Sequence, residues 1–212
     1  MYGISEVISM KIGIMGGTFD PIHNGHLHLA RTALTQFDLD QIWFMPNGMP
    51  PHKKQSSIES DIHERIAMTR IAIKANKQFY LQEYEAKREK VSYSYKTMEH
   101  FRKIYPDDEF YFIIGADSLF SIETWKHPER LFKACIILAA CRDEAATKES
   151  LNGQIQMLKG KYGAYIKFLA MPLEHVSSHE IRKLIESGEP VSEYIPAEVE
   201  AYIRKEGLYG SG

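Results

Sequence analysis

Two adjacent glycines, Gly16 and Gly17, stand between a short apolar run and a segment whose apolar residues recur at helical spacing. The run at 11–15 has the character of a buried strand, and the segment from Leu27 to Leu34 has that of a helix. Glycine adopts backbone conformations that other residues avoid and lets a ligand approach the main chain closely. The free amides at the start of a helix favour an anion, usually a phosphate. The sequence therefore predicts a strand, a tight turn and a helix, with a phosphate site at the turn.

Two histidines lie at the start of this expected helix, which Asn24 or Asp20 can cap. His23 and His26 are three residues apart, so their side chains can point the same way. Neutral or protonated, an imidazole can donate a hydrogen bond to a phosphoryl oxygen. Incidental histidines in a glycine-rich turn are the plain alternative, and a metal site with His28 is another. No carboxylate or thiolate at ligand spacing completes a metal site, so no protein-bound metal is expected.

Strand-like and helix-like segments alternate along the whole chain, which predicts an α/β fold: a Rossmann-like parallel sheet with helices on both faces. A single domain is expected over residues 11–212, with 1–10 as an N-terminal extension. The sequence has neither the dinucleotide fingerprint nor a P-loop lysine motif, so another device must hold phosphate. Strands are expected at 11–15, 41–45, 79–81, 110–114, 134–140 and 165–170, and helices near 25–34, 60–75, 92–105, 148–161, 177–187 and 196–206.

The composition narrows the range of partners. A formal net charge of −2 with mixed signs argues against a general nucleic-acid or membrane-surface binder and favours a small partner. The two cysteines, Cys135 and Cys141, indicate no disulfide framework and favour a cytoplasmic setting. No run approaches the roughly 20 apolar residues of a membrane span, and residues 1–9 do not resemble a signal peptide. The sequence leaves open whether the chain forms a homo-oligomer.

Three further segments carry candidate site residues. The proline-rich loop at 49–54 includes His52 and Lys53, and it is either a solvated turn or a loop that closes over an anionic substrate. Gly115 and Asp117 follow the strand expected at 110–114, at the sheet edge where ligands bind, although Asp117 could simply cap the next helix. Taken alone, Trp125 is more typical of a packed aromatic residue than of a ligand contact.

The helix expected from Ser177 begins with a capping box, because Glu180 follows three residues later. The capping box is a sufficient structural reason for the serines at 177 and 178. Arg182, however, falls in the first turn, where the helix dipole disfavours a cation unless an anion is bound there. The position of this arginine therefore indicates an anion site.

The pattern G-G-T-F-D-P-x-H-x-G-H at residues 16–26 resembles the signature of the HxGH nucleotidylyltransferases. A second motif, V-S-S-H-E-I-R at 176–182, is similar to the I-S-S-T-x-I-R motif of that superfamily. The two motifs, their separation of about 150 residues and the chain length resemble the bacterial nicotinate mononucleotide adenylyltransferases. His179 stands where threonine or serine is usual, so the imidazole replaces a hydroxyl contact there or the contact is lost.

The resemblance implies a set of functional residues, with His23, His26 and Arg182 as the catalytic ones and Mg²⁺ bound with ATP. ATP is then expected at Gly16, Gly17, Thr18, Phe19, His23, His26, Gly115, Asp117, Ser177, Ser178, Ile181 and Arg182. The pyridine nucleotide is expected at His52, Lys53, Ser94, Asp117, Trp125 and Lys126. Within this resemblance Trp125 frames the pyridine ring, and the backbone amide of Lys126 can bind the carboxylate.

The implied reaction is transfer of the adenylyl group of ATP to nicotinate mononucleotide, with release of pyrophosphate. Adenylyl transfer to nicotinamide mononucleotide or to phosphopantetheine is an alternative, although phosphopantetheine enzymes are typically shorter and lack the arginine of the second motif. A non-catalytic nucleotide sensor is an alternative of another class, but such a sensor would be expected to lack one of the histidines or the arginine.

Overall fold

A computed structural model describes residues 9–48, 58–88, 91–142, 145–171 and 176–210. Six strands form one sheet in the order β3-β2-β1-β4-β5-β6, and every neighbouring pair is parallel. The strands are β1 (Lys11–Gly17), β2 (Gln41–Pro46), β3 (Phe79–Leu81), β4 (Glu109–Gly115), β5 (Ile136–Arg142) and β6 (Ile166–Met171).

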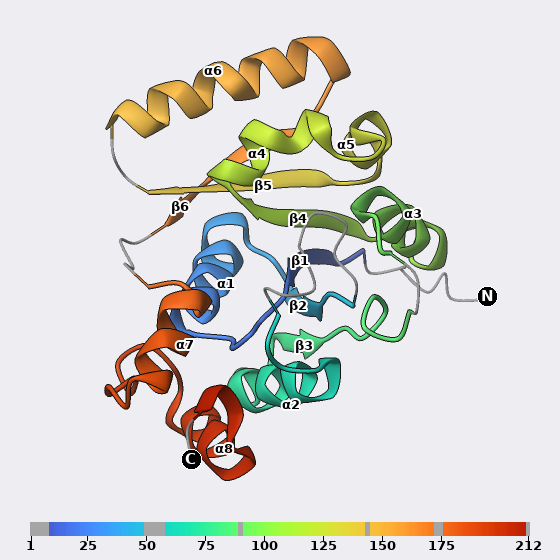
Figure 1. Cartoon of the computed structure of the whole chain (residues 1–212). Helices are drawn as coiled ribbons and strands as arrows, with labels where there is room; N and C mark the ends of the chain where they lie inside the picture. The colour runs from blue at the N-terminus through green and yellow to red at the C-terminus, as the bar shows by residue number, and fades with distance from the viewer. Residues whose placement is uncertain (1–8, 49–57, 89–90, 143–144, 172–175, 211–212) are drawn as a thin grey trace, which may run out of the picture.

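Helices cover both faces of this sheet (Figure 1). One face carries α1 (Asn24–Phe37), α2 (Ile62–Ile73), α7 (Ser178–Glu186) and α8 (Ala197–Glu206). The other carries α3 (Ser94–Ile104), α4 (Ala116–Ser121), α5 (Pro128–Ala134) and α6 (Ala145–Tyr162). Two 3₁₀ helices, η2 (Ile122–Thr124) and η3 (Leu208–Gly210), complete the described elements.

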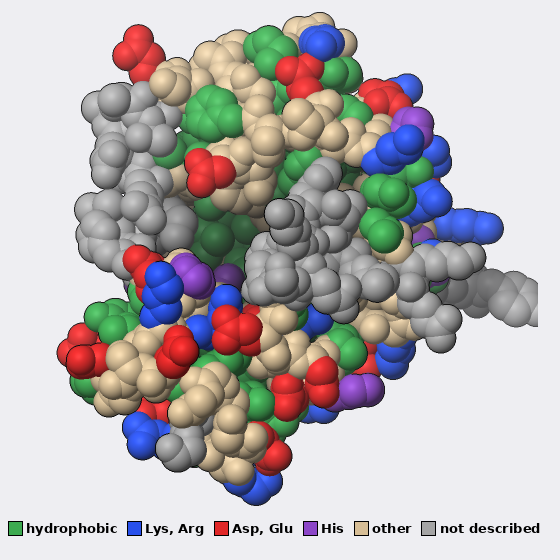
Figure 2. Space-filling view, in the orientation of Figure 1, with side chains coloured by type: hydrophobic (Ala, Val, Ile, Leu, Met, Phe, Trp, Pro, Cys, Tyr) green, Lys and Arg blue, Asp and Glu red, His purple; other side chains and the backbone are tan. Residues whose placement is uncertain are grey.

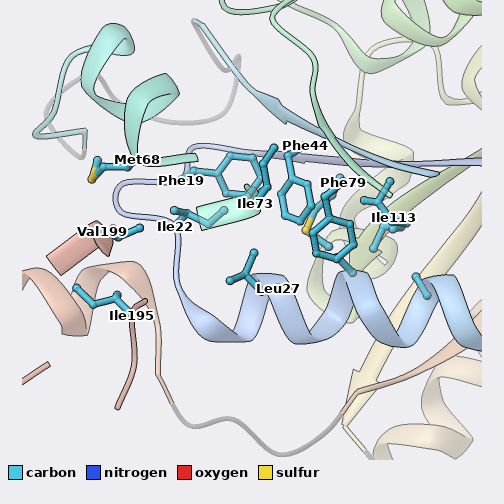
Figure 3. Close-up of a cluster of buried hydrophobic side chains, with 14 of the residues drawn as sticks. Phe19, Ile22, Leu27, Phe44, Met68, Ile73, Phe79, Ile113, Ile195 and Val199 are labelled. Carbon is cyan, nitrogen blue, oxygen red and sulfur yellow. The ribbon is translucent and has the colours of Figure 1, made fainter. Parts of the chain in front are cut away.

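Alternate residues of the central strands enter two separate hydrophobic cores. Met15, Phe44 and Ile113 face the core under α1, α2, α7 and α8, part of which is drawn in Figure 3. Their neighbours Ile14 and Met45 face the core under α3 to α6. Because both faces are covered, the central strands are apolar without interruption, as expected for a parallel sheet. The predicted α/β fold with helices on both faces is confirmed.

The strand order reverses at β1, which lies between β2 and β4. In open parallel sheets, ligands bind at the carboxyl ends of the strands beside such a switch point. β1 ends in the two glycines of the sequence motif, and β4 ends at Gly115. The topology thus brings both predicted segments to the same edge of the sheet.

Several expected helix starts were wrong in detail. His23, not Asn24 or Asp20, is the residue before α1, because the side chains of Asn24 and Asp20 bond elsewhere. The helix expected from residue 92 begins at Ser94, after Tyr93. Gly115 precedes α4 and leaves Asp117 in its first turn. The capping box between Ser177 and Glu180 is confirmed.

The expected N-terminal extension lies mostly outside the described residues. Of residues 1–10, only Ser9 and Met10 are described; Ser9 Oγ donates to the carbonyl of Asp107 at 2.7 Å, and the Met10 amide donates to Asp108 Oδ1 at 2.9 Å. None of the helices in the described ranges combines the length and apolar character needed to cross a bilayer.

Candidate active site

A cavity of about 410 Å³ opens at the carboxyl ends of β1, β2 and β4. Its floor is apolar and comes from the strands, for example Met15, Met45 and Phe112. Figure 2 shows this hollow with hydrophobic side chains at its base and histidine side chains beside it. The predicted site residues that line it are Gly16, Gly17, Thr18, His26, Ser94, Gly115, Trp125 and Lys126. An apolar cavity with a few polar groups at its wall is typical of a small-molecule site.

The turn after β1 depends on glycine at position 17. A Cβ added there would lie 2.8 Å from a ring carbon of Phe19. Phe19 itself is buried and has a left-handed backbone with φ of 50°, an unusual conformation for a residue other than glycine. Its ring packs edge-on against His26, with 5.0 Å between ring centroids. Phe19 therefore shapes the turn from the core side and does not line the cavity.

His23 and His26 lie side by side, with 3.7 Å between their ring centroids. The backbone amide of His23 donates to His26 Nδ1 at 3.2 Å. An accepting Nδ1 leaves the proton of the neutral ring on Nε2, so His26 Nε2 is a hydrogen-bond donor. His26 lines the cavity, which gives the donor a route to a bound phosphoryl group.

His23 is neutral at physiological pH in this setting. The ring is buried, and this burial lowers the pKa of His23 to about 4. Its Nδ1 is inaccessible to solvent and has no hydrogen-bond partner in the part of the chain that the structure describes. Two adjacent imidazolium ions would repel each other, so a neutral His23 also favours the close approach of the two rings.

Asp20 is the centre of a buried hydrogen-bond network behind the turn. Its carboxylate accepts from the amides of Glu59 at 2.8 Å and Ser60 at 3.2 Å. The hydroxyl of Tyr209 donates to Asp20 Oδ1 at 2.7 Å, and Ser60 Oγ donates to the Tyr209 oxygen at 2.7 Å. The network thus joins the first turn of the fold to η3 near the other end of the described chain.

Arg182 is held over the same turn. Its Nη1 donates to the carbonyl of Asp20 at 2.7 Å, and its Nε donates to Glu59 Oε1 at 2.7 Å. Ser178 Oγ donates to the carbonyl of Pro21 at 2.9 Å, which ties the start of α7 to the turn. Arg182 is the fifth residue of α7, so it lies just past the first turn where it was expected, and its acidic partners are Glu59 and Asp20.

The carboxyl group of Glu85 is a further polar group at the cavity wall. Glu85 is buried and lines the wall, and its Oε1 accepts from Thr97 Oγ1 at 2.6 Å. Burial raises the pKa of Glu85. Ser92 Oγ and Asn47 Oδ1 are also buried, and neither has a hydrogen-bond partner among the described residues. Buried polar atoms usually find a partner in the protein or in ordered water.

The remaining predicted site residues are exposed at the surface, buried in the core or outside the described residues. Asp117 is exposed and does not line the cavity, and Ser177 Oγ bonds within the capping box. The side chain of Ile181 is fully buried in the core, so it offers a ligand only its backbone. His179 is exposed at the start of α7. The predicted loop residues His52 and Lys53 lie outside the described residues.

Sequence reasoning missed the groups that hold the turns in place, chiefly Asp20, Glu59, Arg65, Glu85 and Tyr209. Asp20 lies inside the first motif, and that position was the one available signal. The others are marked by no local pattern, because their contacts join distant parts of the chain. Among the described residues there is no cluster of three or more histidine, cysteine or acidic side chains that could hold a metal ion.

Comparison with known proteins identifies the family. A family model described as cytidylyltransferase-like matches residues 14–184. A Clostridium kluyveri protein is 40% identical over 202 residues, covering 94% of this chain and 99% of that protein. A Carboxydothermus hydrogenoformans protein is 44% identical over 199 residues, covering 94% and 98%. Both carry the name probable nicotinate-nucleotide adenylyltransferase. The chain belongs to the nicotinate-nucleotide adenylyltransferase family.

Solved structures of an adenylyltransferase share its fold. Plasmodium falciparum nicotinic acid mononucleotide adenylyltransferase complexed with APC has a TM-score of 0.75 at 21% identity, covering 96% of this chain and 98% of that one. The same protein complexed with NaAD has a TM-score of 0.74 at 22% identity, with the same coverage. The family and the adenylyltransferase activity predicted from the two motifs are confirmed, and so is the fold predicted from the alternation of strands and helices.

Proposed function

We propose that the chain transfers the adenylyl group of ATP to nicotinate mononucleotide in the cavity at the carboxyl ends of β1, β2 and β4. The products are nicotinate adenine dinucleotide and pyrophosphate. The names of the relatives support this substrate pair, and so does the likeness to a structure complexed with NaAD. ATP and the mononucleotide are the proposed partners, without nucleic acid or membrane. Cys135 and Cys141 are buried and form no disulfide among the described residues, which supports a reducing compartment such as the cytoplasm.

The observation that carries the proposal is the joint lining of one cavity by two groups of residues far apart in sequence. Gly16, Gly17 and His26 lie on one part of the wall, where phosphate is expected. Trp125 and Lys126 line the same cavity, and there we propose that the pyridine ring and its carboxylate bind. The two substrates of an adenylyl transfer must meet in a single space, and this arrangement provides one.

The chemistry needs no nucleophile from the protein. An oxygen of the mononucleotide phosphate forms a bond to the α-phosphorus of ATP, and the bond from that phosphorus to the bridging oxygen of pyrophosphate breaks. The acceptor phosphate is already an anion at neutral pH, so catalysis consists of positioning two anions and stabilising the developing charge.

Three side chains are proposed for these tasks. His26 Nε2 donates to the α-phosphoryl oxygens, as its tautomer allows. The neutral ring of His23 lies against His26 and orients phosphate. Arg182 binds the leaving pyrophosphate from the start of α7, and the free amides at that helix end add to the attraction. Mg²⁺ enters as the complex with ATP, since this hard cation prefers phosphate oxygens and water.

Parallel assays of pyrophosphate release test this function. The chain, ATP and Mg²⁺ are incubated with nicotinate mononucleotide, nicotinamide mononucleotide or phosphopantetheine. Release that is fastest with the nicotinate compound supports the proposal. Comparable rates with the amide would show dual specificity, and silence with all three acceptors while ATP still binds would show a nucleotide sensor in place of an enzyme.

A further inference from the structure

Arg65 is a buried arginine whose contacts bridge two turns at the cavity. It lies near the start of α2 and is 2% exposed. Its Nη1 donates to the carbonyl of Thr18 at 2.8 Å and to the carbonyl of Asn47 at 2.9 Å. One guanidinium nitrogen therefore holds two separate main-chain segments at once.

The two bridged segments belong to the two halves of the proposed site. Thr18 follows β1 in the glycine turn, where ATP phosphates are proposed to bind. Asn47 follows β2 and leads toward the loop expected to bind the acceptor. Both residues line the cavity. The distance between their carbonyls therefore affects the distance between the substrates.

Neighbouring contacts show that this junction is tightly built. The amide of Asn47 donates to the carbonyl of Gly17 at 2.9 Å, which is a second link between the turns. A Cβ added at Gly48 would lie 2.8 Å from the carbonyl oxygen of Glu85, so the backbone after Asn47 packs directly on another wall of the cavity. Movement of the Asn47 turn would disturb both surfaces.

Packing alone does not explain a guanidinium at this place. The nearby Asp20 and Asp61 carboxylates favour the Arg65 charge only at a distance, since the described residues show no hydrogen bond between Arg65 and a carboxylate. Its Nε is buried without a hydrogen-bond partner among the described residues. Burying a charge with incomplete partners is costly, and an apolar side chain would fill the space at lower cost. The two carbonyl contacts are what the arginine supplies and an apolar side chain does not.

We propose that Arg65 is a positioning residue for adenylyl transfer, which fixes the ATP turn at Thr18 relative to the acceptor turn at Asn47. The inference rests on the proposed function. Each substrate binds mainly to its own turn, whereas in-line attack needs both turns in the correct relative place. Loss of Arg65 should therefore lower turnover far more than it lowers either binding affinity.

Two variants and a matched control test this role. Arg65→Met removes both hydrogen bonds and keeps an apolar side chain, and Arg65→Lys keeps a cation on a shorter stem. We expect Arg65→Met to lower kcat about 100-fold, while the separate Kd values for MgATP and the mononucleotide change less than about threefold. Arg65→Lys should recover part of the lost kcat, because one ammonium nitrogen can donate to two carbonyls. Arg70→Met, on the exposed side of the same helix, should keep the kcat of the native chain.

Each possible result for the Arg65 variants either supports or overturns the positioning role. Parallel losses of kcat and of both affinities in Arg65→Met would overturn the positioning role, and so would unchanged kcat in both Arg65 variants. If Arg65→Met does not fold, Arg65→Lys decides alone: lowered kcat with retained Kd values supports the role, and unchanged kcat overturns it. A native chain that turns over no acceptor rejects the proposed function itself, which separates that failure from a failure of the Arg65 role.

Discussion

Arg182 Nε donates to Glu59 Oε1 at 2.7 Å, so the arginine proposed to bind pyrophosphate is paired with a carboxylate in this structure. The Arg182 side chain is 9% exposed, whereas that of Glu59 is 51% exposed and has room to leave. Phosphate oxygens and the Glu59 carboxylate seek the same guanidinium. In the proposed complex, Glu59 therefore competes with ATP for Arg182.

Replacing Glu59 with glutamine should tighten ATP binding. Glu59→Gln keeps the shape and removes the charge, and we expect the Kd for MgATP to fall about three- to fivefold, as for a half-exposed ion pair. Titration calorimetry at constant salt measures this. Glu200→Gln removes a carboxylate from an ion pair on α8 and should leave the Kd unchanged. Weaker ATP binding in Glu59→Gln would mean that Glu59 orients Arg182 instead of competing with the nucleotide.

Replacing His26 with alanine should lower kcat about 100-fold or more, by analogy with removal of one preorganised donor to a developing charge. Steady-state kinetics of pyrophosphate release measure the effect. His28→Ala serves as the control, because His28 is exposed on the same helix and does not line the cavity. A loss below about threefold in a folded His26→Ala variant would remove His26 from the mechanism.

The free energy of unfolding should fall as the pH is lowered, because His23 takes up a proton more readily in the unfolded chain than in the folded one. Burial lowers the pKa of His23 from 6.5 to about 4 in the folded chain. Below pH 6.5 the unfolded chain therefore takes up a proton that the folded chain resists, and stability is lost as the pH falls toward 4. Between pH 7 and pH 5 the loss from this group should be about 2 kcal/mol.

Urea unfolding at the two pH values measures this loss. His23→Gln cannot protonate, so the difference in the free energy of unfolding between pH 7 and pH 5 should shrink by that amount. His63→Gln changes an exposed histidine and should leave the difference as it is in the native chain. An equal difference in the native chain and in His23→Gln would show that His23 protonates freely in the folded state.

Tyr209→Phe should reduce the free energy of unfolding by about 1–2 kcal/mol, because the Asp20 carboxylate loses a buried hydroxyl donor. Tyr165→Phe is the matched control, since the ring of Tyr165 is largely exposed. Chemical denaturation of the three proteins in one buffer gives the comparison. Equal stability of Tyr209→Phe and the native chain would show that another group satisfies Asp20.

Trp125→Ala should raise the KM for the mononucleotide about tenfold while the KM for ATP stays near its native value, because the indole is proposed to pack against the pyridine ring. Phe120→Ala removes an exposed aromatic side chain from α4 and should change neither constant. If both KM values rise together in Trp125→Ala, the tryptophan supports the fold of the cavity and does not select the acceptor.

The sequence was sufficient for the features that are local. The glycine turn, the capping box at Ser177 and the alternation of strands and helices each depend on a few neighbouring residues. The order of the strands and the supports of the site depend on distant pairs. Tyr209 and Asp20 are 189 positions apart, and Arg182 and Glu59 are 123 apart. No spacing rule connects residues at such separations, so these contacts could not be predicted.

The hydrogen bond between Tyr209 and Asp20 can form only after nearly the whole chain has been synthesised. A ribosome makes the glycine turn and both histidines early, and the chain can pair β1 with β2 while translation continues. The Asp20 network stays incomplete until residue 209 has been added. An interrupted nascent chain therefore carries the glycine turn and both histidines without the hydrogen bond from Tyr209 to Asp20.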